Sequence, residues 1–181
     1  MQVIPLSLPG LLLVTPNVHR DDRGFFLESF SDATYQQHGI DCKFVQDNHS
    51  ASRRDTVRGL HFQRGPGQAK LVRASAGRIY DVAVDIRPNS STCGRWEGVY
   101  LDAEAHQQLF VPAGFAHGFC VVSEHAEVQY KVSTPYDGAL EAGFRFDDPE
   151  VGVAWPSQAP RVSTRDAAAP SYASWRAAGA R

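Results

Sequence analysis

The chain has 181 residues, of which 43% are hydrophobic and 21% are charged, and its formal net charge is −2. This length and composition predict a single globular domain over residues 1–181. The chain lacks the basic field that binding to nucleic acid or to an anionic membrane surface requires, so we expect neither as a partner.

Cysteines and hydropathy indicate the compartment. Cys42, Cys93 and Cys120 are odd in number and contain no C-x-x-C pair, which argues against a disulfide framework and a zinc knuckle. No secretory signal pattern opens the sequence, and no apolar run approaches the ~18 residues that span a bilayer. We therefore expect a reduced protein in the cytoplasm.

Short alternating or β-branched runs recur along the chain, separated by Gly and Pro turns. A short helix is predicted at 31–39, with Ser31 or Asp32 as its N-cap and Gly39 as its stop, and a loose tail at about 176–181. Together these features predict an all-β fold, a sandwich or barrel of antiparallel sheets with few short helices. The predicted strands are 11–14, 25–30, 44–46, 58–62, 71–75, 79–86, 96–101, 109–111, 118–122, 127–133 and 143–146.

The predicted strand at 79–86 carries two carboxylates on one face. Asp81 and Asp85 alternate with apolar residues, so they point to the same side. The simpler interpretation is that they face water. The alternative, nearly as well supported, is a barrel in which they face a ligand or its basic partners.

His61 and Lys70 lie on successive predicted strands. A lone strand histidine is most often a satisfied core residue, and a lysine that begins a strand is usually solvated. The turn at Gly65-Pro66-Gly67 could return Lys70 beside His61 within a hairpin. The pair then suggests carbon-acid chemistry beside a carbonyl.

The segment 112–117 has the P-x-G-x-x-H form of the second motif of cupin barrels, and it ends at His117. The partner motif, His-x-His with a downstream glutamate, is missing, because Phe62 and Gln63 follow His61. A metal site needs about three protein ligands in register. We therefore expect a cupin-like barrel without a metal.

Seven ordered blocks of sequence resemble the dTDP-4-dehydrorhamnose 3,5-epimerases over nearly the whole chain. The blocks are residues 22–29, 44–50, 58–63, 70–73, 81–87, 112–119 and 147–149. The resemblance implies a dimeric jelly-roll enzyme that binds a nucleotide sugar and uses no cofactor. It further implies inversion at C3 and C5 of dTDP-4-keto-6-deoxyglucose.

The resemblance assigns four catalytic roles. It implies that His61 is the general base and Asp166 its carboxylate partner, while Lys70 lies near the 4-keto oxygen and Tyr130 is the acid on the opposite face of the sugar. Alone, Tyr130 would be read as core filler and Asp166 as a turn cap. The chemistry suits these types, because an enolate needs a cation at its oxygen and inversion needs a base and an acid on opposite faces.

The resemblance also implies a set of binding residues, among which Tyr136 stacks on the thymine, and Arg23 and Phe25 reach the partner's site across the dimer. One feature conflicts with ideal strand geometry, because Arg58 and His61 are three residues apart and should point to opposite faces. Either the strand bulges at Gly59, or Arg58 reaches the diphosphate from the strand's end. The implied binding residues are Arg23, Phe25, Glu28, Gln46, Asn48, Arg58, His117, Tyr136, Glu141 and Arg165.

Three alternatives to the double epimerase remain open. The nearest is an epimerase that inverts only one centre, C3 or C5, of a related nucleotide-linked sugar. The others are a sugar-binding cupin without catalysis, against which the intact acid and base speak, and a metal-dependent cupin, against which the missing His-x-His speaks.

Overall fold

The structure, a computed structural model, describes residues 1–178. In this range two antiparallel sheets and a separate hairpin account for the strands. The six-stranded sheet runs in the order β1 (Gln2–Pro5), β2 (Leu12–Thr15), β10 (Gln108–Val111), β7 (Lys70–Ala76), β12 (His125–Val132) and β5 (Gln46–Arg53). The five-stranded sheet runs in the order β13 (Glu141–Gly143), β6 (Val57–Gln63), β11 (Phe115–Val121), β8 (Arg78–Asp85) and β9 (Trp96–Asp102).

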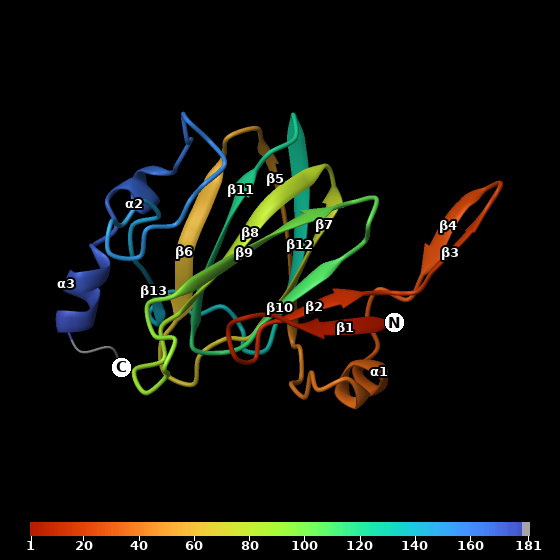
Figure 1. Ribbon diagram of the computed structural model, residues 1–181, viewed down its shortest axis with the longest axis horizontal. Coiled ribbons are helices and arrows are strands. Elements are labelled where there is room, and N and C mark those ends of the chain that lie inside the picture. The colour runs from red at the N-terminus through yellow and green to blue at the C-terminus, as the bar shows by residue number, and fades with distance from the viewer. Residues whose placement is uncertain (179–181) are drawn as a thin grey trace.

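The two sheets pack face to face and enclose the main hydrophobic core (Figure 1). Val72 and Val128 from the six-stranded sheet lie in one buried cluster with Ile79, Ala83 and Phe119 from the five-stranded sheet. Strand neighbours are mostly distant in sequence, as in a cupin-like jelly roll. The predicted fold class is therefore confirmed.

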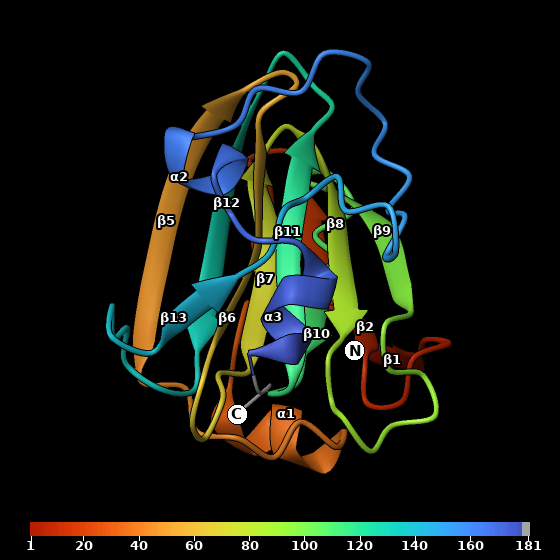
Figure 2. The ribbon, with the colours of Figure 1, turned by 90° about the vertical axis from the view of Figure 1, so that its left-hand side faces the viewer.

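Two short helices lie near the C-terminus: α2 (Thr164–Ala167) contacts β6, and α3 (Tyr172–Ala177) packs on the outer face of the five-stranded sheet. Figure 2 shows α3 lying across this face. Trp175 packs on Phe62 of β6 and on Phe144, with ring centroids 5.1 and 5.9 Å away. The predicted loose tail at 176–181 is therefore wrong at residues 176 and 177, which belong to α3, and its residues 179–181 lie outside the described part.

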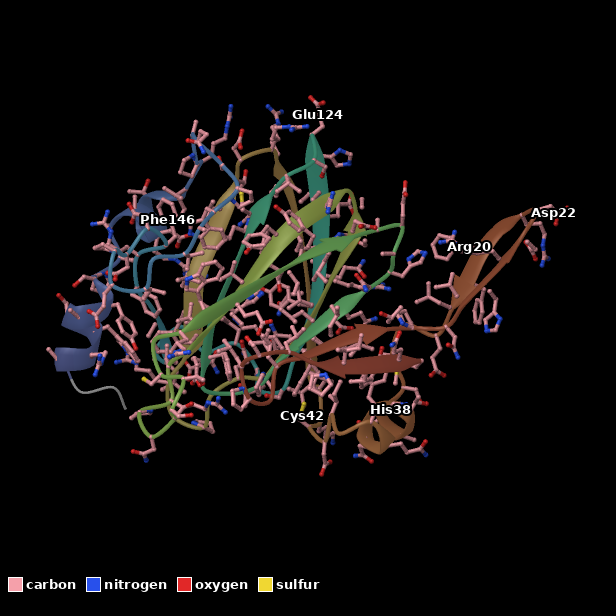
Figure 3. The ribbon with its side chains drawn as sticks, in the orientation of Figure 1. Arg20, Asp22, His38, Cys42, Glu124 and Phe146 are labelled. Atoms are coloured by element: carbon pink, nitrogen blue, oxygen red, sulfur yellow. The ribbon has the colours of Figure 1, made fainter. Side chains whose placement is uncertain are left out.

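The hairpin of β3 (Val18–Asp21) and β4 (Gly24–Leu27) projects from the body on the side opposite α2 (Figure 1), and we call it the arm. Figure 3 places Asp22 at the tip and Arg20 along the arm. Phe25 and Phe26 are 56% and 72% exposed. Helix α1 (Asp32–Gln37) follows the arm, as predicted, and anchors to the six-stranded sheet through Tyr35, which donates a hydrogen bond to Gln108.

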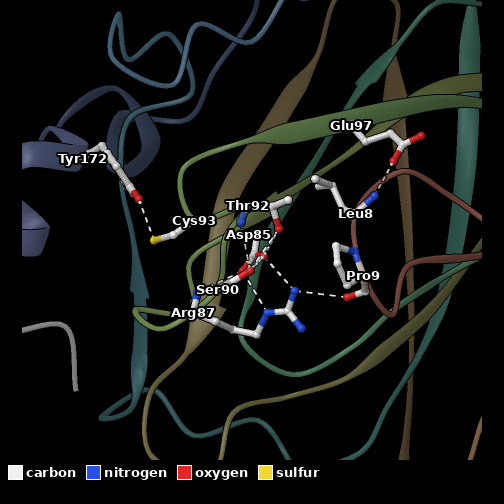
Figure 4. Close-up of polar contacts among 9 residues, drawn as sticks. All are labelled: Leu8, Pro9, Asp85, Arg87, Ser90, Thr92, Cys93, Glu97 and Tyr172. Carbon is white, nitrogen blue, oxygen red and sulfur yellow. Dashed lines mark hydrogen bonds and ion pairs between the residues drawn. The ribbon is translucent and has the colours of Figure 1, made fainter.

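Strand β8 differs from the simpler prediction. Both Asp81 and Asp85 are completely buried on the inner face, so the expectation that they face water is wrong. Asp85 accepts hydrogen bonds from Arg87, Ser90 and Thr92 and so closes the loop between β8 and β9 (Figure 4). Burial alone would raise the pKa of Asp85, but these donors hold it well below its usual value.

Several boundaries also differ from prediction. The predicted strand at 44–46 is instead β5, which begins at Gln46, and the one at 143–146 is β13, which ends at Gly143. Strands β1 and β3 and helices α2 and α3 were not predicted. Strand β5 is almost entirely polar, and its pairing with β12 along eight residues supplies what its β-propensity lacks.

Candidate active site

A cavity of about 650 Å³ lies between the two sheets. Residues of β6, β11 and β13 line one wall, residues of β5, β7 and β12 line the other, and the segment around α2 closes the rim. Eight residues expected at the site line this one cavity: Arg58, His61, Lys70, His117, Tyr130, Glu141, Arg165 and Asp166.

His61 and Asp166 form a dyad. Nε2 of His61 lies 2.7 Å from Oδ1 of Asp166, and the Asp166 side chain is 4% exposed. The Ser163 hydroxyl accepts a hydrogen bond from the Asp166 amide, which fixes the turn that holds the carboxylate. A parallel bridge between Thr56 and Arg161 lays this segment along β6.

The electrostatics of the dyad favour an ionised Asp166. Burial would raise the pKa of Asp166, but the hydrogen bond and charge of His61, the Gly59 amide and Arg165 together hold it below its usual value. The Nη2 atom of Arg165 is 3.0 Å from the same Nε2. Because Nε2–H donated to a carboxylate cannot also accept a hydrogen bond, the shorter bond to Asp166 decides the tautomer, and Nδ1 is left as the basic nitrogen.

A bulge at Gly59 brings Arg58 and His61 to the same wall. His117 pairs with His61 and Phe119 pairs with Arg58, so two steps along β11 match three along β6. Gly59 has φ +123°, and a Cβ there would lie 2.6 Å from Cα of Gly118. The predicted bulge is confirmed, and only glycine fits it.

Lys70 enters the cavity from the opposite sheet. Strands β6 and β7 belong to different sheets, so the predicted hairpin between them is wrong, although Nζ of Lys70 lies 3.4 Å from the carbonyl oxygen of His61. Burial lowers the pKa of Lys70 to about 8, against the opposing effect of the Asp81 and Glu141 carboxylates. The ammonium therefore persists at neutral pH.

Tyr130 lies on the wall opposite His61. It pairs with Val72 of β7 and Asn48 of β5, and its side chain faces the space between the sheets. Burial raises the pKa of Tyr130, Arg58 acts against this and Glu141 adds to it. The phenol is thus a protonated group at neutral pH.

His117 forms a second imidazole–carboxylate pair. Its Nε2 lies 2.9 and 3.0 Å from the two oxygens of Asp81, and both side chains are buried. Burial lowers the pKa of His117 more than Asp81 raises it, so the ring is neutral at pH 7. Since His117 and His61 are register partners, the two pairs sit side by side on one wall.

A polar chain continues from the cavity toward its mouth. Glu141 accepts hydrogen bonds from Arg165 at 2.7 Å and from the Tyr136 hydroxyl at 2.8 Å. The Tyr136 amide donates to Gln46, whose own amide group donates to Asn48. These residues were all expected at the site, and the structure joins them to the cavity.

The remaining expected residues, Arg23, Phe25 and Glu28, lie on or just after the arm and do not line the cavity of their own chain. Arg161 does line it but was not predicted. The sequence could have indicated Arg161, because it lies four residues before Arg165 and both side chains line the cavity. Asp81 was noticed in the sequence, but its contact with His117 was not predicted.

The fold and the cavity define a cupin-like barrel whose interior holds an imidazole paired with a carboxylate, a buried ammonium and a phenol. Such a set can remove a proton next to a carbonyl, hold the resulting enolate and return a proton from the other side. In residues 1–178 no group of three or more His, Cys, Asp or Glu side chains is arranged to hold a metal ion.

Comparisons with known proteins identify the family. The sequence profile described as dTDP-4-dehydrorhamnose 3,5-epimerase matches residues 5–174. The enzyme of that name from Salmonella typhimurium is 49% identical over 94% of either chain. The chain therefore belongs to the dTDP-4-dehydrorhamnose 3,5-epimerase family.

Solved structures agree with this assignment. The dTDP-6-deoxy-D-glucose-3,5-epimerase of Legionella pneumophila, in complex with dTDP-4-keto-L-rhamnose, superposes with a TM-score of 0.91 at 41% identity, covering 94% of this chain and 92% of that one. A 3'-monoepimerase from Streptomyces bikiniensis, in complex with dTDP-quinovose, also superposes at 0.91, with 36% identity and coverage of 97% and 90%.

The bulge gives a prediction about Gly59→Ala. We expect this variant to lose about 1–3 kcal/mol more unfolding free energy than Gly24→Ala, because both sites have positive φ but only Gly59 is blocked by a neighbouring strand. A Cβ at Gly24 would have nothing within 4 Å. Urea unfolding of the two variants measures the difference, and equal losses would show that the contact with β11 does not constrain this site.

Proposed function

We propose that the protein inverts C3 and C5 of dTDP-4-keto-6-deoxy-D-glucose and so produces dTDP-4-keto-L-rhamnose. One observation carries this proposal: the His61 base and the Tyr130 phenol line one cavity from opposite sheets, and the Lys70 ammonium reaches the same space. The family membership and the bound sugar nucleotide of the Legionella relative support the substrate class.

In the proposed reaction, Nδ1 of His61 removes the proton from a carbon next to the 4-keto group. Asp166 keeps Nε2 protonated and balances the imidazolium that forms. Lys70 donates to the developing enolate oxygen, where a fixed donor in a site with little water lowers a barrier by ~3 kcal/mol. Tyr130 then returns a proton from the opposite face.

The binding residues fit a nucleotide diphosphate at the cavity rim. Arg58, Arg161 and Arg165 surround the rim, and guanidinium groups bind phosphate oxygens in a bidentate manner. Tyr136 is 58% exposed at the mouth, where an aromatic face is available for stacking on the thymine. We assign Gln46, Asn48, His117 and Glu141 to the same substrate.

Double inversion is favoured over the single-centre alternative by sequence similarity. Named 3,5-epimerases reach 49% identity with this chain, whereas the Streptomyces 3'-monoepimerase reaches 36%. The decisive measurement is to incubate the protein with dTDP-4-keto-6-deoxyglucose in heavy water and to locate deuterium by NMR. Label and inversion at both C3 and C5 are expected, and label at C3 alone would establish the single-centre epimerase.

His61→Ala tests the base. We expect this variant to lose the exchange of substrate hydrogen with solvent deuterium, because the Nε2 atom of His117, the other imidazole on that wall, is bound to the buried Asp81. Binding of dTDP, measured by calorimetry, should remain nearly intact. Full exchange by His61→Ala would remove this residue from the role of base.

Tyr130→Phe tests the acid. Removal of the hydroxyl leaves the base and the enolate donor in place, so we expect hydrogen exchange to persist better than inversion. The same NMR experiment measures both rates on one sample. Equal loss of exchange and inversion would contradict the assignment of Tyr130 to reprotonation.

We further propose a homodimer in which the arm of one protomer completes the cavity of the other, and a cytoplasmic location. Phe25 and Phe26 are exposed on an arm that points away from α2, as expected for residues of a subunit interface (Figure 1). Free thiols at Cys42, Cys93 and Cys120 support a reducing compartment. No helix in residues 1–178 has the length and apolar character needed to cross a bilayer.

Mixing two damaged chains tests the shared site. His61→Ala damages the body, and Arg23→Glu reverses the charge of the arm. If the arm acts on the partner, each mixed dimer contains one site with neither substitution, and random mixing should restore about a quarter of wild-type activity. No recovery in mixtures whose subunits have exchanged would show that the arm does not act across an interface.

A further inference from the structure

Asp81 is a buried charged residue that the proposed reaction does not use. It lies in the middle of β8, on the inner face, with 0% exposure. Its one side-chain partner among the described residues is Nε2 of His117. Because burying a carboxylate costs several kcal/mol unless it is compensated, a neutral imidazole alone is a poor reason for a carboxylate here.

Lys70 is a buried cation that has no close carboxylate partner among residues 1–178. Its side chain is buried, and its hydrogen bond to the His61 carbonyl oxygen is long, at 3.4 Å. The ion pairs within 4 Å among residues 1–178 do not include Lys70, and its register partners Val111 and Val132 are apolar. A charge so placed needs a compensating charge nearby.

The other charged groups around the cavity are already matched. Glu141 binds Arg165, and Asp166 binds His61. Arg58 and Arg161 are cations and would only disfavour a second positive charge, while Tyr130 is a neutral phenol. The carboxylate left for Lys70 is Asp81, which is buried on the inner face and binds His117, a residue that lines the same cavity as Lys70.

We propose that Asp81 is a positioning residue, whose carboxylate keeps Lys70 in the ammonium form and holds His117 as the neutral Nε2–H tautomer. The inference rests on the proposed function, because the ammonium serves the enolate oxygen. It adds that the catalytic cation depends on a carboxylate that does not touch the substrate.

The direction of the effect follows from the charges. Burial lowers the pKa of Lys70 to about 8, and Asp81 is the strongest of the groups that raise it. Removing that charge lowers the pKa further, by about 1–3 units for a close charge in a buried site. In Asp81→Asn, Lys70 would then lose its proton near neutral pH, whereas in the wild-type protein it does so above neutral pH.

The chain is well suited to a direct measurement, because Lys43, Lys70 and Lys131 are its only lysines. Protein labelled with ¹³C at lysine Cε gives one NMR signal for each, and Lys70→Arg assigns the signal of interest. For Asp81→Asn we expect the Lys70 titration to move down by about 1–3 units. An unchanged Lys70 titration in folded Asp81→Asn would overturn the proposal.

Asp47→Asn is the matched control. Asp47 is an exposed carboxylate that pairs with Lys131 at 2.8 Å, so its removal should alter the Lys131 signal and leave Lys70 unchanged. Turnover adds a functional readout: in Asp81→Asn the alkaline limb of kcat should move down with the Lys70 titration, while KM changes little. A uniform fall in kcat at every pH would indicate structural damage and count against the proposal.

The wild-type protein provides a test that does not depend on a variant folding. Nitrogen chemical shifts of His117 at pH 7 should show a proton on Nε2 and none on Nδ1. The pKa of Lys70 should be about 8 or higher. The opposite tautomer, or a Lys70 that titrates below about pH 6, would refute the role of Asp81. These titrations need no substrate, so this inference and the proposed function can fail separately.

Discussion

The site depends on the close approach of β6 and β11 where Gly59 faces Gly118. With no side chain at either position the strands can bulge, and the bulge turns Arg58 and His61 toward the same space. An ideal strand would send one of them to the outer face, among the aromatic rings under α3. The presence of Arg58 and His61 in one wall is thus a consequence of the close backbone contact between β6 and β11.

The interior between the sheets is divided along its length. One part is filled with apolar side chains such as Val72, Ile79 and Phe119, and the other contains charged groups around the cavity. The charged pairs lie along one wall and its rim, where the five-stranded sheet and α2 supply both partners of each pair. These charged groups surround the cavity although the formal net charge of the whole chain is only −2.

Much of this architecture could be predicted from local sequence. Gly and Pro turns located most strands, the Gly39 stop located α1, and spacing alone exposed the conflict between Arg58 and His61 that the bulge resolves. Partnership between distant segments could not be predicted. Neither the polar strand β5 nor the inward direction of Asp81 follows from local residues, because pairing with β12 and contact with His117 decide them.

The His61 imidazole is oriented by Asp166, which lies in the last segment of the described chain, at the periphery of the barrel. Asp166 lies a few residues before α3, and α3 is fastened by Trp175 packing and by the Tyr172 amide, which donates to Asp148. Such a peripheral element opens with a smaller free energy than the sheets beneath it. On warming, the imidazole would lose its carboxylate while the barrel is still intact, so heat inactivation would precede melting of the fold.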